Sequence, residues 1–322
     1  MNDRVITTRA PLRISFGGGG SDLPSYYREH GGFVVSAAID RHVCMLATTA
    51  FQERFRLKHT GWEEVDDVAA VEHPILRAAL EHHWDGRPLE LASVADVPPG
   101  TGLGSSGAYA VCLLRTLELA AGLPACPPAE LAERACELEI GILGRTVGKQ
   151  DQYVAAHGGL CAYTFHPDDT VTVEPLAVPE AVAEAIRERF LLFYTGRTRS
   201  AETLFAQQVK GDPEVVRAVH RAKELAIEMR AALEAGDLAR CADLMNEQWE
   251  AKRARSPDAI TEPIAALREQ ALAAGARGAT LMGAGGGGFL LVYADDPEAL
   301  RAAMDAPELR FGLEPAGCRA HA

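Results

Sequence analysis

Apolar positions along this chain follow two spacings, and the two do not alternate regularly. Short apolar runs of strand length occur at residues 89–94 and 160–165, each bounded by Pro, Gly or charged residues. Longer runs rich in Ala, Leu and Val, such as residues 108–121, have the length and composition of helices. Predicted strands follow one another in pairs in the first half, and predicted helices follow one another in the second. A strict alternation would indicate a doubly wound parallel sheet, so this order predicts an α+β fold instead.

Turn and capping residues between these runs set the predicted boundaries. We predict strands at residues 5–8, 12–16, 33–39, 43–51, 54–59, 89–94, 160–165, 171–174, 190–194 and 289–293. We predict helices at residues 23–29, 72–83, 108–121, 127–144, 213–235 and 297–304, one that begins after Asp237, and one that Ser256-Pro257 opens and Gly275 ends. Ser21 or Asp22, Asp212 and Asp237 are the expected N-caps. Pro167 and the aspartates after it interrupt the pattern, which predicts two domains, residues 1–167 and 168–322.

Composition and charge restrict the class of partner. The 322 residues are 48% hydrophobic and 24% charged, as in an ordinary globular protein, and the net charge is −13. So acidic a chain is not expected to bind nucleic acid or an anionic membrane, and an anionic substrate would need a local cluster of positive groups. No apolar stretch reaches membrane-spanning length, no signal peptide precedes the first predicted strand, and the seven cysteines lack the spacing of a zinc site. We therefore predict a cytoplasmic protein with free thiols. The sequence does not determine its oligomeric state, and a homodimer is one possibility.

A glycine-rich stretch at residues 98–108, Pro-Pro-Gly-Thr-Gly-Leu-Gly-Ser-Ser-Gly-Ala, joins the strand at 89–94 to the helix at 108–121. Its glycines can adopt positive φ and turn backbone N–H groups inward, and the following helix presents the positive end of its dipole. Such a loop attracts anions, so we interpret it as a cradle for nucleotide phosphates. It is not a common P-loop, because no lysine follows the glycines, and it lacks the acidic partner of a dinucleotide-binding loop.

The same stretch resembles the phosphate-binding loop of the GHMP kinases, the superfamily of galactokinase, homoserine kinase, mevalonate kinase and phosphomevalonate kinase. Their loop reads Pro-x-x-x-Gly-Leu-Gly-Ser-Ser-x-Ala, and residues 98–108 match every fixed position. Three further segments match in order: Arg13 to Asp22, Glu139 with the Gly-x-x-Asp-Gln run that contains Asp151, and the glycines at 283–288. The resemblance implies a two-domain α+β GHMP kinase fold with its active site in the cleft between the domains, with ATP and Mg²⁺ as cofactors and a small-molecule sugar phosphate as partner.

This resemblance also implies roles for individual residues. Asp151 would face the hydroxyl that accepts the phosphoryl group, as a general base or as an orienting group, with Arg13 and Lys149 assisting. Ser106 and Glu139 would hold Mg²⁺. The residues expected to meet the substrate are Gly19, Gly20, Ser21, Asp22 and Arg199. Those expected to meet the nucleotide are Pro99, Gly100, Gly102, Leu103, Gly104, Ser105, Ser106, Gly107, Gly285 and Gly286.

Within the superfamily, residues 10–24 and 148–153 look most like the D-glycero-D-manno-heptose 7-phosphate kinases, which phosphorylate the anomeric C1 hydroxyl. Galactokinases carry Glu-His where this chain has Gly19-Gly20, which argues against galactose and opens space for a bulkier or phosphorylated sugar. The alternatives are an octose 7-phosphate, fucose, galactose or mevalonate as substrate and, in a different class, a non-catalytic nucleotide- or sugar-binding regulator. A sugar phosphate needs a cationic receptor, and the candidates are Arg41, Lys149, Arg197 and Arg199.

Overall fold

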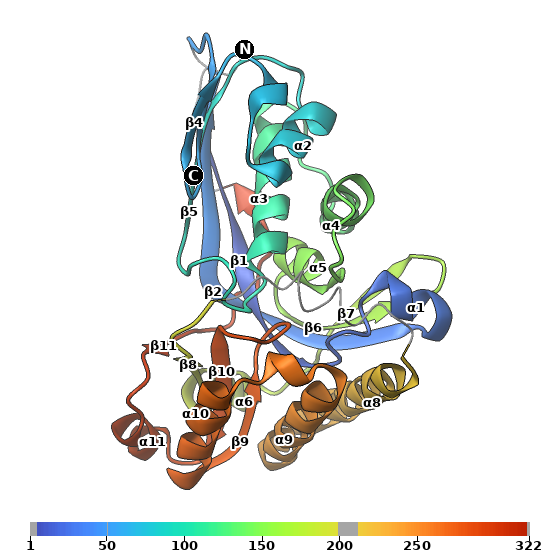
Figure 1. Cartoon of the computed structure of the whole chain (residues 1–322), viewed down its shortest axis with the longest axis vertical. Coiled ribbons are helices and arrows are strands. Elements are labelled where there is room, and N and C mark those ends of the chain that lie inside the picture. Colours follow the sequence, from blue (N-terminus) through green and yellow to red (C-terminus); the bar gives the residue numbers. More distant parts are fainter. Residues whose placement is uncertain (1–4, 50, 199–211, 321–322) are drawn as a thin grey trace.

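The computed structural model describes residues 5–49, 51–198 and 212–320, and it has two layered parts stacked along the long axis of the molecule (Figure 1). The upper part is a tall, twisted sheet with helices packed on one face, and the lower part is a smaller sheet accompanied by its own helices. Because strands and helices group rather than alternate, the predicted α+β class is confirmed. Across the described residues, no helix has the length and apolar character needed to cross a membrane.

Within the described residues, the upper sheet has eight strands. Six follow the order β12-β1-β2-β5-β3-β4, while β6 pairs with β2 and β7 pairs with β6. The β3–β5 pair is parallel, and the other pairs are antiparallel. The strands are β1 (Ile6–Gly17), β2 (Gly32–Thr48), β3 (Phe55–Lys58), β4 (Trp62–Val65), β5 (Glu90–Ala95), β6 (Leu160–Phe165), β7 (Val171–Pro175) and β12 (Arg319–Ala320).

The two longest strands, β1 and β2, are continuous where the sequence predicts breaks. The pairing register shifts between Pro11 and Leu12 of β1, which lie opposite His42 and Ile39 of β2. The two β2 residues between those partners are therefore extra residues of a bulge, and Pro11 tolerates this place because it has no N–H to donate. The predictions of two shorter strands in each case are wrong, because a bulge lets one long strand bend without ending.

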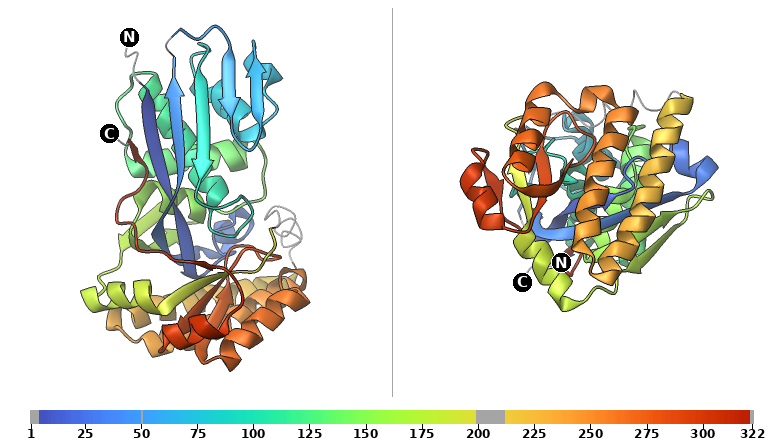
Figure 2. Two further views of the ribbon diagram at one scale, coloured as in Figure 1. Left: turned by 90° about the vertical axis from the view of Figure 1, so that its left-hand side faces the viewer. Right: turned by 90° about the horizontal axis from the view of Figure 1, so that it is seen from below.

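The helices of the upper part cover one face of its sheet, and Figure 2 shows the other face turned toward the viewer in its left panel. α3 lies at the centre of this layer and is buried along most of its length, which explains why apolar residues occur on every side of it. The helices of this part are α1 (Pro24–His30), α2 (Pro74–His83), α3 (Ser105–Ala120), α4 (Pro128–Cys136) and α5 (Gln150–His157), with a 3-10 turn, η1 (Val68–Ala70), and a π-helical turn, η2 (Glu137–Ile142).

In the lower part, the described residues form an antiparallel sheet of four strands in the order β11-β8-β10-β9. β10 is apolar at every position because both faces of this sheet are covered. Its residues alternate between two hydrophobic cores, starting with Phe289 in the main core and Leu290 in a second core shared with α10 and α11. The elements are α6 (Glu180–Arg189), β8 (Phe190–Tyr194), α8 (Pro213–Ala235), α9 (Leu238–Arg255), η3 (Pro257–Ala259), α10 (Glu262–Ala273), β9 (Ala276–Leu281), β10 (Phe289–Ala294), α11 (Pro297–Ala303) and β11 (Glu308–Leu309).

Helix ends in this part test the predicted caps. Asp212 accepts a hydrogen bond from the Glu214 amide at 2.8 Å, and Asp237 accepts one from the Arg240 amide at 2.9 Å, so both predicted N-caps are confirmed. Ser256-Pro257 opens only the short η3 turn, and α10 begins later, after Thr261. The predicted single helix to Gly275 is therefore wrong at its start.

The predicted domain boundary at residue 168 does not coincide with the change of sheet. β7 lies after that residue yet pairs with β6 in the upper sheet, and the lower sheet begins only at β8. The end of the chain then returns to the upper part, where β12 pairs with β1 and Leu313 bridges to Ile39. Figure 2 shows this return in its left panel. The division at 168 therefore stays a prediction, and β12 ties the two parts together.

Candidate active site

A cavity of about 1040 Å³ lies between the two parts and is lined by residues of both. The upper part reaches it from the end of β1, from the loop before α3 and from the start of α5. The lower part contributes the end of α9 and the turn that follows β9. This is the place where the sequence predicts an inter-domain active site.

The loop before α3 has the conformation that its glycines predict. Gly100, Gly102 and Gly104 have φ of 76°, 78° and 76°, and α3 begins directly afterwards at Ser105. Gly104 is the N-cap, so no side chain occupies the N-terminus of the helix. The first N–H groups of α3 can therefore bind an anion in the cavity, which Ser105 and Ser106 also line.

The second glycine turn packs directly on this loop. A methyl group at Gly102 would lie 2.7 Å from the carbonyl oxygen of Met282, and one at Gly283 would lie 2.6 Å from the Cα atom of Gly102. Lys252 holds the turn from the lower part, because its Nζ donates to the carbonyl oxygens of Leu281 and, at 2.8 Å, of Gly283. Two glycine turns that are distant in sequence therefore meet at one wall of the cavity.

Asp151 lies beside the loop and is fixed by Arg13. The Nε and Nη2 atoms of Arg13 lie 2.8 and 2.7 Å from the same oxygen, Oδ1, of Asp151. Arg13 also donates from Nη1 to the Gly102 carbonyl at 2.5 Å, which ties the pair to the phosphate loop. Gly107 of α3 lies so close that a methyl group there would be 2.6 Å from the Asp151 Cβ atom. The arrangement leaves the second oxygen, Oδ2, free of Arg13 and lines the cavity with a carboxylate.

Glu139 is almost fully buried in the π-helical turn and faces Ser106 across the cavity wall. Its Oε1 accepts hydrogen bonds at 2.5 Å from the Ser106 hydroxyl and from Arg145 Nη1, and its Oε2 accepts one at 2.8 Å from Gln152. Burial raises the pKa of Glu139, against the lowering effect of the bonds from Ser106 and Arg145. π-helical turns often occur at functional sites, and this one aims a carboxylate at a hydroxyl.

The glycine turn after β1 is shaped by Asp22. Its Oδ1 accepts from the Gly20 amide at 3.0 Å and its Oδ2 from the Gln150 amide at 3.3 Å, so it joins this turn to α5. The prediction that Ser21 or Asp22 caps α1 is wrong, because Leu23 occupies the N-cap position and no side chain forms a capping bond there. Burial raises the pKa of Asp22, and the nearby charge of Asp151 raises it further.

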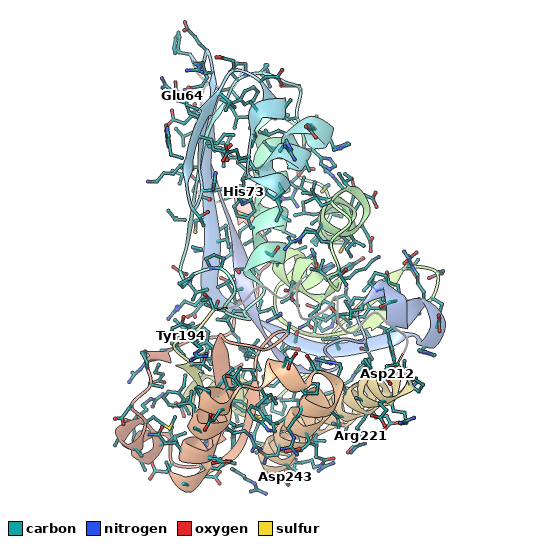
Figure 3. The ribbon with its side chains drawn as sticks, in the orientation of Figure 1. Glu64, His73, Tyr194, Asp212, Arg221 and Asp243 are labelled. Atoms are coloured by element: carbon teal, nitrogen blue, oxygen red, sulfur yellow. The ribbon has the colours of Figure 1, made fainter. Side chains whose placement is uncertain are left out.

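In the upper part, one end of the cavity is lined by His59, His73 and Tyr109, and the segment from Ser93 to Pro99 also lines the cavity. The rings of His59 and His73 lie 4.7 Å apart, and those of His73 and Tyr109 lie 5.2 Å apart. Figure 3 shows His73 in the upper part, well above Tyr194, which lies where the two parts meet. This aromatic end suits a flat ring such as a nucleobase.

Two family models match the chain and together cover more than half of it. The model described as the GHMP kinases N-terminal domain matches residues 68–159, and the GHMP kinases C-terminal model matches residues 229–308. The chain belongs to the GHMP kinase family. It is accordingly a phosphotransferase with an alcohol group as acceptor, as the sequence predicts, and kinases of this family use ATP.

Individual relatives extend over most of this GHMP kinase. It is 28% identical to the D-glycero-alpha-D-manno-heptose 7-phosphate kinase of Campylobacter jejuni, over 91% of this chain and 90% of that protein. It is 27% identical to the bifunctional fucokinase/GDP-fucose pyrophosphorylase of Arabidopsis thaliana over 97% of this chain, which spans 32% of that longer protein. Its fold matches the crystal structure of a D-glycero-D-manno-heptose 1-phosphate kinase from Bacteroides thetaiotaomicron, with a TM-score of 0.79, 24% identity, and coverage of 98% of this chain and 99% of that one. The predicted two-domain GHMP kinase fold is confirmed.

Most predicted site residues of this GHMP kinase line the one cavity. Among the residues that the structure describes, those at its wall are Arg13, Gly19, Gly20, Asp22, Pro99, Gly100, Gly102, Gly104, Ser105, Ser106, Gly107, Glu139 and Asp151. Two predicted residues, Ser21 and Leu103, are buried behind the wall. Ser21 bonds the carbonyls of Gly18 and Phe33, while the Leu103 carbonyl accepts from the Arg13 amide, so both are scaffold residues.

Three other predicted residues do not line this cavity. Lys149 points away from the cavity: its Nζ bonds Glu133 at 2.9 and 3.0 Å and the Asp169 carbonyl at 2.8 Å. Gly285 and Gly286 do not line the cavity either, because the Gly286 amide donates to Ala259, and Gly283 and Ala284 take their place.

Of the predicted phosphate receptors, Arg199 lies outside the described residues. Arg41 bonds Asp40 and the Arg310 carbonyl, outside the cavity lining. Arg197 is not part of the lining either, although its carbonyl accepts from the Gly288 amide. None of these described candidates therefore faces the site.

Sequence reasoning missed three cations that do line the cavity: Arg145, Lys252 and Arg255. Lys252 and Arg255 lie in the last turn of α9, where basic residues ordinarily serve the helix dipole. Their three-residue spacing places them on one face of the helix, and that spacing is the signal available in the sequence.

Proposed function

We propose that this GHMP kinase transfers the γ-phosphoryl group of ATP to the anomeric C1 hydroxyl of D-glycero-D-manno-heptose 7-phosphate and forms the 1,7-bisphosphate. The observation that carries the proposal is the Arg13–Asp151 pair, which lies against the phosphate loop inside a cavity lined by both parts of the chain. The similarity to a heptose 7-phosphate kinase over 91% of the chain supports the choice of sugar.

Asp151 is the residue that would meet the acceptor hydroxyl. Both Arg13 contacts fall on Oδ1, so Oδ2 is the oxygen that can accept a hydrogen bond from the hydroxyl of a sugar. This bond would orient the hydroxyl toward the phosphate loop, and Oδ2 would take its proton as the new ester bond forms. Arg13 holds the carboxylate in place and balances its charge, which favours the negative charge that develops on the attacking oxygen.

Phosphate binding would fall to the loop and to the N-terminus of α3. Phosphoryl transfer depends mainly on positioning and on neutralising charge, and open N–H groups at a helix start supply both. Ser106 and Glu139 present a hydroxyl and a buried carboxylate, the hard oxygen donors that Mg²⁺ accepts beside nucleotide phosphates. In the described residues no group of three His, Cys, Asp or Glu converges on a metal position, which fits an ion held mostly by phosphates and water. When bound, Mg²⁺ would supply further neutralisation of the phosphate charge.

The choice of acceptor rests on the glycine turn. Around Gly19, no atom of the described residues lies within 4 Å of the position that a Cβ would take, so within that part of the chain the wall leaves space at this point. A seven-carbon sugar phosphate is longer than an unphosphorylated hexose and would use this space. L-Fucose is the second candidate, because two bifunctional fucokinases are 27% and 26% identical to this chain over nearly its whole length.

The test is an assay of ADP release and of product by phosphorus NMR, with Mg-ATP and each of heptose 7-phosphate, an octose 7-phosphate, L-fucose, galactose and mevalonate. We expect the highest kcat/KM with heptose 7-phosphate and a second phosphate at C1. Asp151→Asn should lower kcat by about 10²- to 10⁴-fold, the usual contribution of a positioned acid or base. Asp243→Asn, which changes an exposed carboxylate on the outer side of α9 (Figure 3), is the matched control and should leave kcat unchanged.

Three results would contradict the proposal. Preference for L-fucose would replace the acceptor, while no turnover of any sugar in the panel would favour a non-catalytic binding protein. A kcat for Asp151→Asn within a few-fold of the parent would remove Asp151 from its role.

A further inference from the structure

Two cations at the end of α9 lie inside the cavity without a use in the reaction described above. Lys252 and Arg255 both line it, and Arg255 is only 5% exposed. Both come from the lower part of the molecule, opposite the turn that contains Gly19 and Gly20. The formal net charge of the chain is −13, yet two positive side chains on one helix turn face the cavity. Such a local positive cluster in an acidic protein is what binding of an anionic ligand requires.

Arg255 reaches across to the glycine turn of the upper part. Its Nη1 donates to the Gly19 carbonyl, and a methyl group at Gly20 would lie 2.7 Å from the same nitrogen. Its Nε is buried and, among the described residues, has no hydrogen-bond partner. A guanidinium has five N–H donors, so most of its donors remain for a ligand.

Lys252 supports the second glycine turn through two carbonyl oxygens, and among the described residues its third N–H donor has no acceptor. Within the described part of the chain, neither Lys252 nor Arg255 forms an ion pair with a carboxylate within 4.0 Å. The charged groups that act on Lys252 are themselves positive, Arg255 and Arg13, while Asp22 is the carboxylate that acts on Arg255.

Burial of these charges is costly. Burial lowers the pKa of Arg255 to about 10, against the opposing effect of Asp22. Burial also lowers the pKa of Lys252 well below its usual value, and the neighbouring Arg255 and Arg13 lower it further. Arg255 is buried and Lys252 is half-buried, and two like charges with no carboxylate within 4.0 Å among the described residues are stabilised when an anion binds between them.

We propose that Arg255, with Lys252 beside it, is the receptor for the phosphate that the acceptor sugar already carries. This inference rests on the proposed function, because it assumes that the sugar reaches Asp151 with one end and carries an anionic group at the other. The nucleotide phosphates have their own site at the start of α3, on the upper part, whereas Arg255 faces the open wall at Gly19. A phosphate oxygen would take the unused donors of the guanidinium in a forked contact, and its double negative charge would offset both cations.

The test compares a sugar with and without its phosphate. Equilibrium binding of D-glycero-D-manno-heptose 7-phosphate and of unphosphorylated heptose is measured by calorimetry without ATP, on the parent and on Arg255→Gln, Lys252→Met and Arg255→Lys. Arg253→Gln is the matched control, since Arg253 lies on the same helix turn but is exposed and pairs with Glu250 at 2.8 Å. Thermal unfolding of each variant checks that it is folded.

We expect Arg255→Gln to weaken binding of the phosphorylated sugar 10- to 100-fold while changing binding of the unphosphorylated sugar less than threefold. The ratio of the affinity for the phosphorylated sugar to the affinity for the unphosphorylated sugar should also fall in Lys252→Met. In Arg255→Lys this ratio should recover part of what Arg255→Gln loses, and in Arg253→Gln it should equal that of the parent. Equal losses for both sugars would overturn the inference and assign Arg255 to joining the two parts. An unchanged ratio would overturn it as well. Failure of the proposed function would be a different result, namely that the parent protein releases no ADP from Mg-ATP with any sugar phosphate.

Discussion

Gly107 allows a sharp test of how closely α3 packs against Asp151, the carboxylate proposed above to meet the acceptor hydroxyl. It is the third residue of α3 and has an ordinary helical φ, so replacing it with alanine introduces no backbone strain. On helix propensity alone, Gly107→Ala would stabilise the protein by up to about 1 kcal/mol. The added methyl group, however, would lie 2.6 Å from the Cβ of Asp151 and 2.9 Å from both its carbonyl carbon and the Gln152 nitrogen.

The size of the effect follows from these distances. Carbon atoms pack at about 3.5–4.0 Å, so α3 and α5 must separate by roughly 1 Å to admit the methyl group. The atoms that must move belong partly to backbone and cannot rotate away. Misplacing a catalytic group by about 1 Å can cost around 100-fold in rate, so we expect kcat for Gly107→Ala to fall about 100-fold. Overpacking costs about 1–3 kcal/mol of stability, which the gain in helix propensity partly offsets.

Steady-state kinetics and chemical denaturation measured on the same samples would separate the two effects. Gly141→Ala is the control, because Gly141 lies in the π-helical turn and the three atoms nearest to its added methyl group all belong to the side-chain end of the exposed Glu137. That variant should keep kcat within about threefold of the parent, since such a side chain can move aside. If Gly107→Ala also kept kcat within threefold, the close packing of Asp151 on α3 would not control the reaction, and the reasoning would be refuted.

Two further predictions concern charged groups outside the cavity. Lys149→Met should lower the free energy of unfolding by about 1–3 kcal/mol, because Glu133 loses its ion pair, and it should leave kcat unchanged. A large loss of kcat with an unchanged free energy of unfolding would instead assign Lys149 to the active site. Burial raises the pKa of Glu314, but bonds from Arg319 and from the Ala316 amide outweigh it and leave that pKa below its ordinary value of 4.5. A lowered carboxylate pKa stabilises the fold above about pH 4.5 and loses that contribution as the pH falls further. The stability difference between the parent and Glu314→Gln should therefore shrink from pH 6 to pH 3 in denaturation curves, and a difference that stays constant with pH would contradict this.

Local chemistry determined those parts of the protein that the sequence predicts well. The loop before α3 needs positive φ at Gly100, Gly102 and Gly104, and only its own residues decide whether such a turn forms. The caps at Asp212 and Asp237 are likewise bonds between a side chain and an amide two or three residues away. Interactions this short are written directly into the order of residues, which is why the phosphate loop and several helix starts can be predicted before the structure is seen.

Tertiary packing decided what lies within reach of the reaction. Lys149 and Asp151 are two residues apart, but about 100° of rotation per residue puts them on different sides of α5, and Glu133 holds the lysine away from the cavity. For Arg255 the sequence indicates a place in a last helical turn and a shared helix face with Lys252, but only the fold places it against Gly19. The two glycine turns also meet only because the lower sheet packs below the upper one. Contacts between residues more than a hundred positions apart depend on the whole packed core, so no local pattern in the chain could specify them.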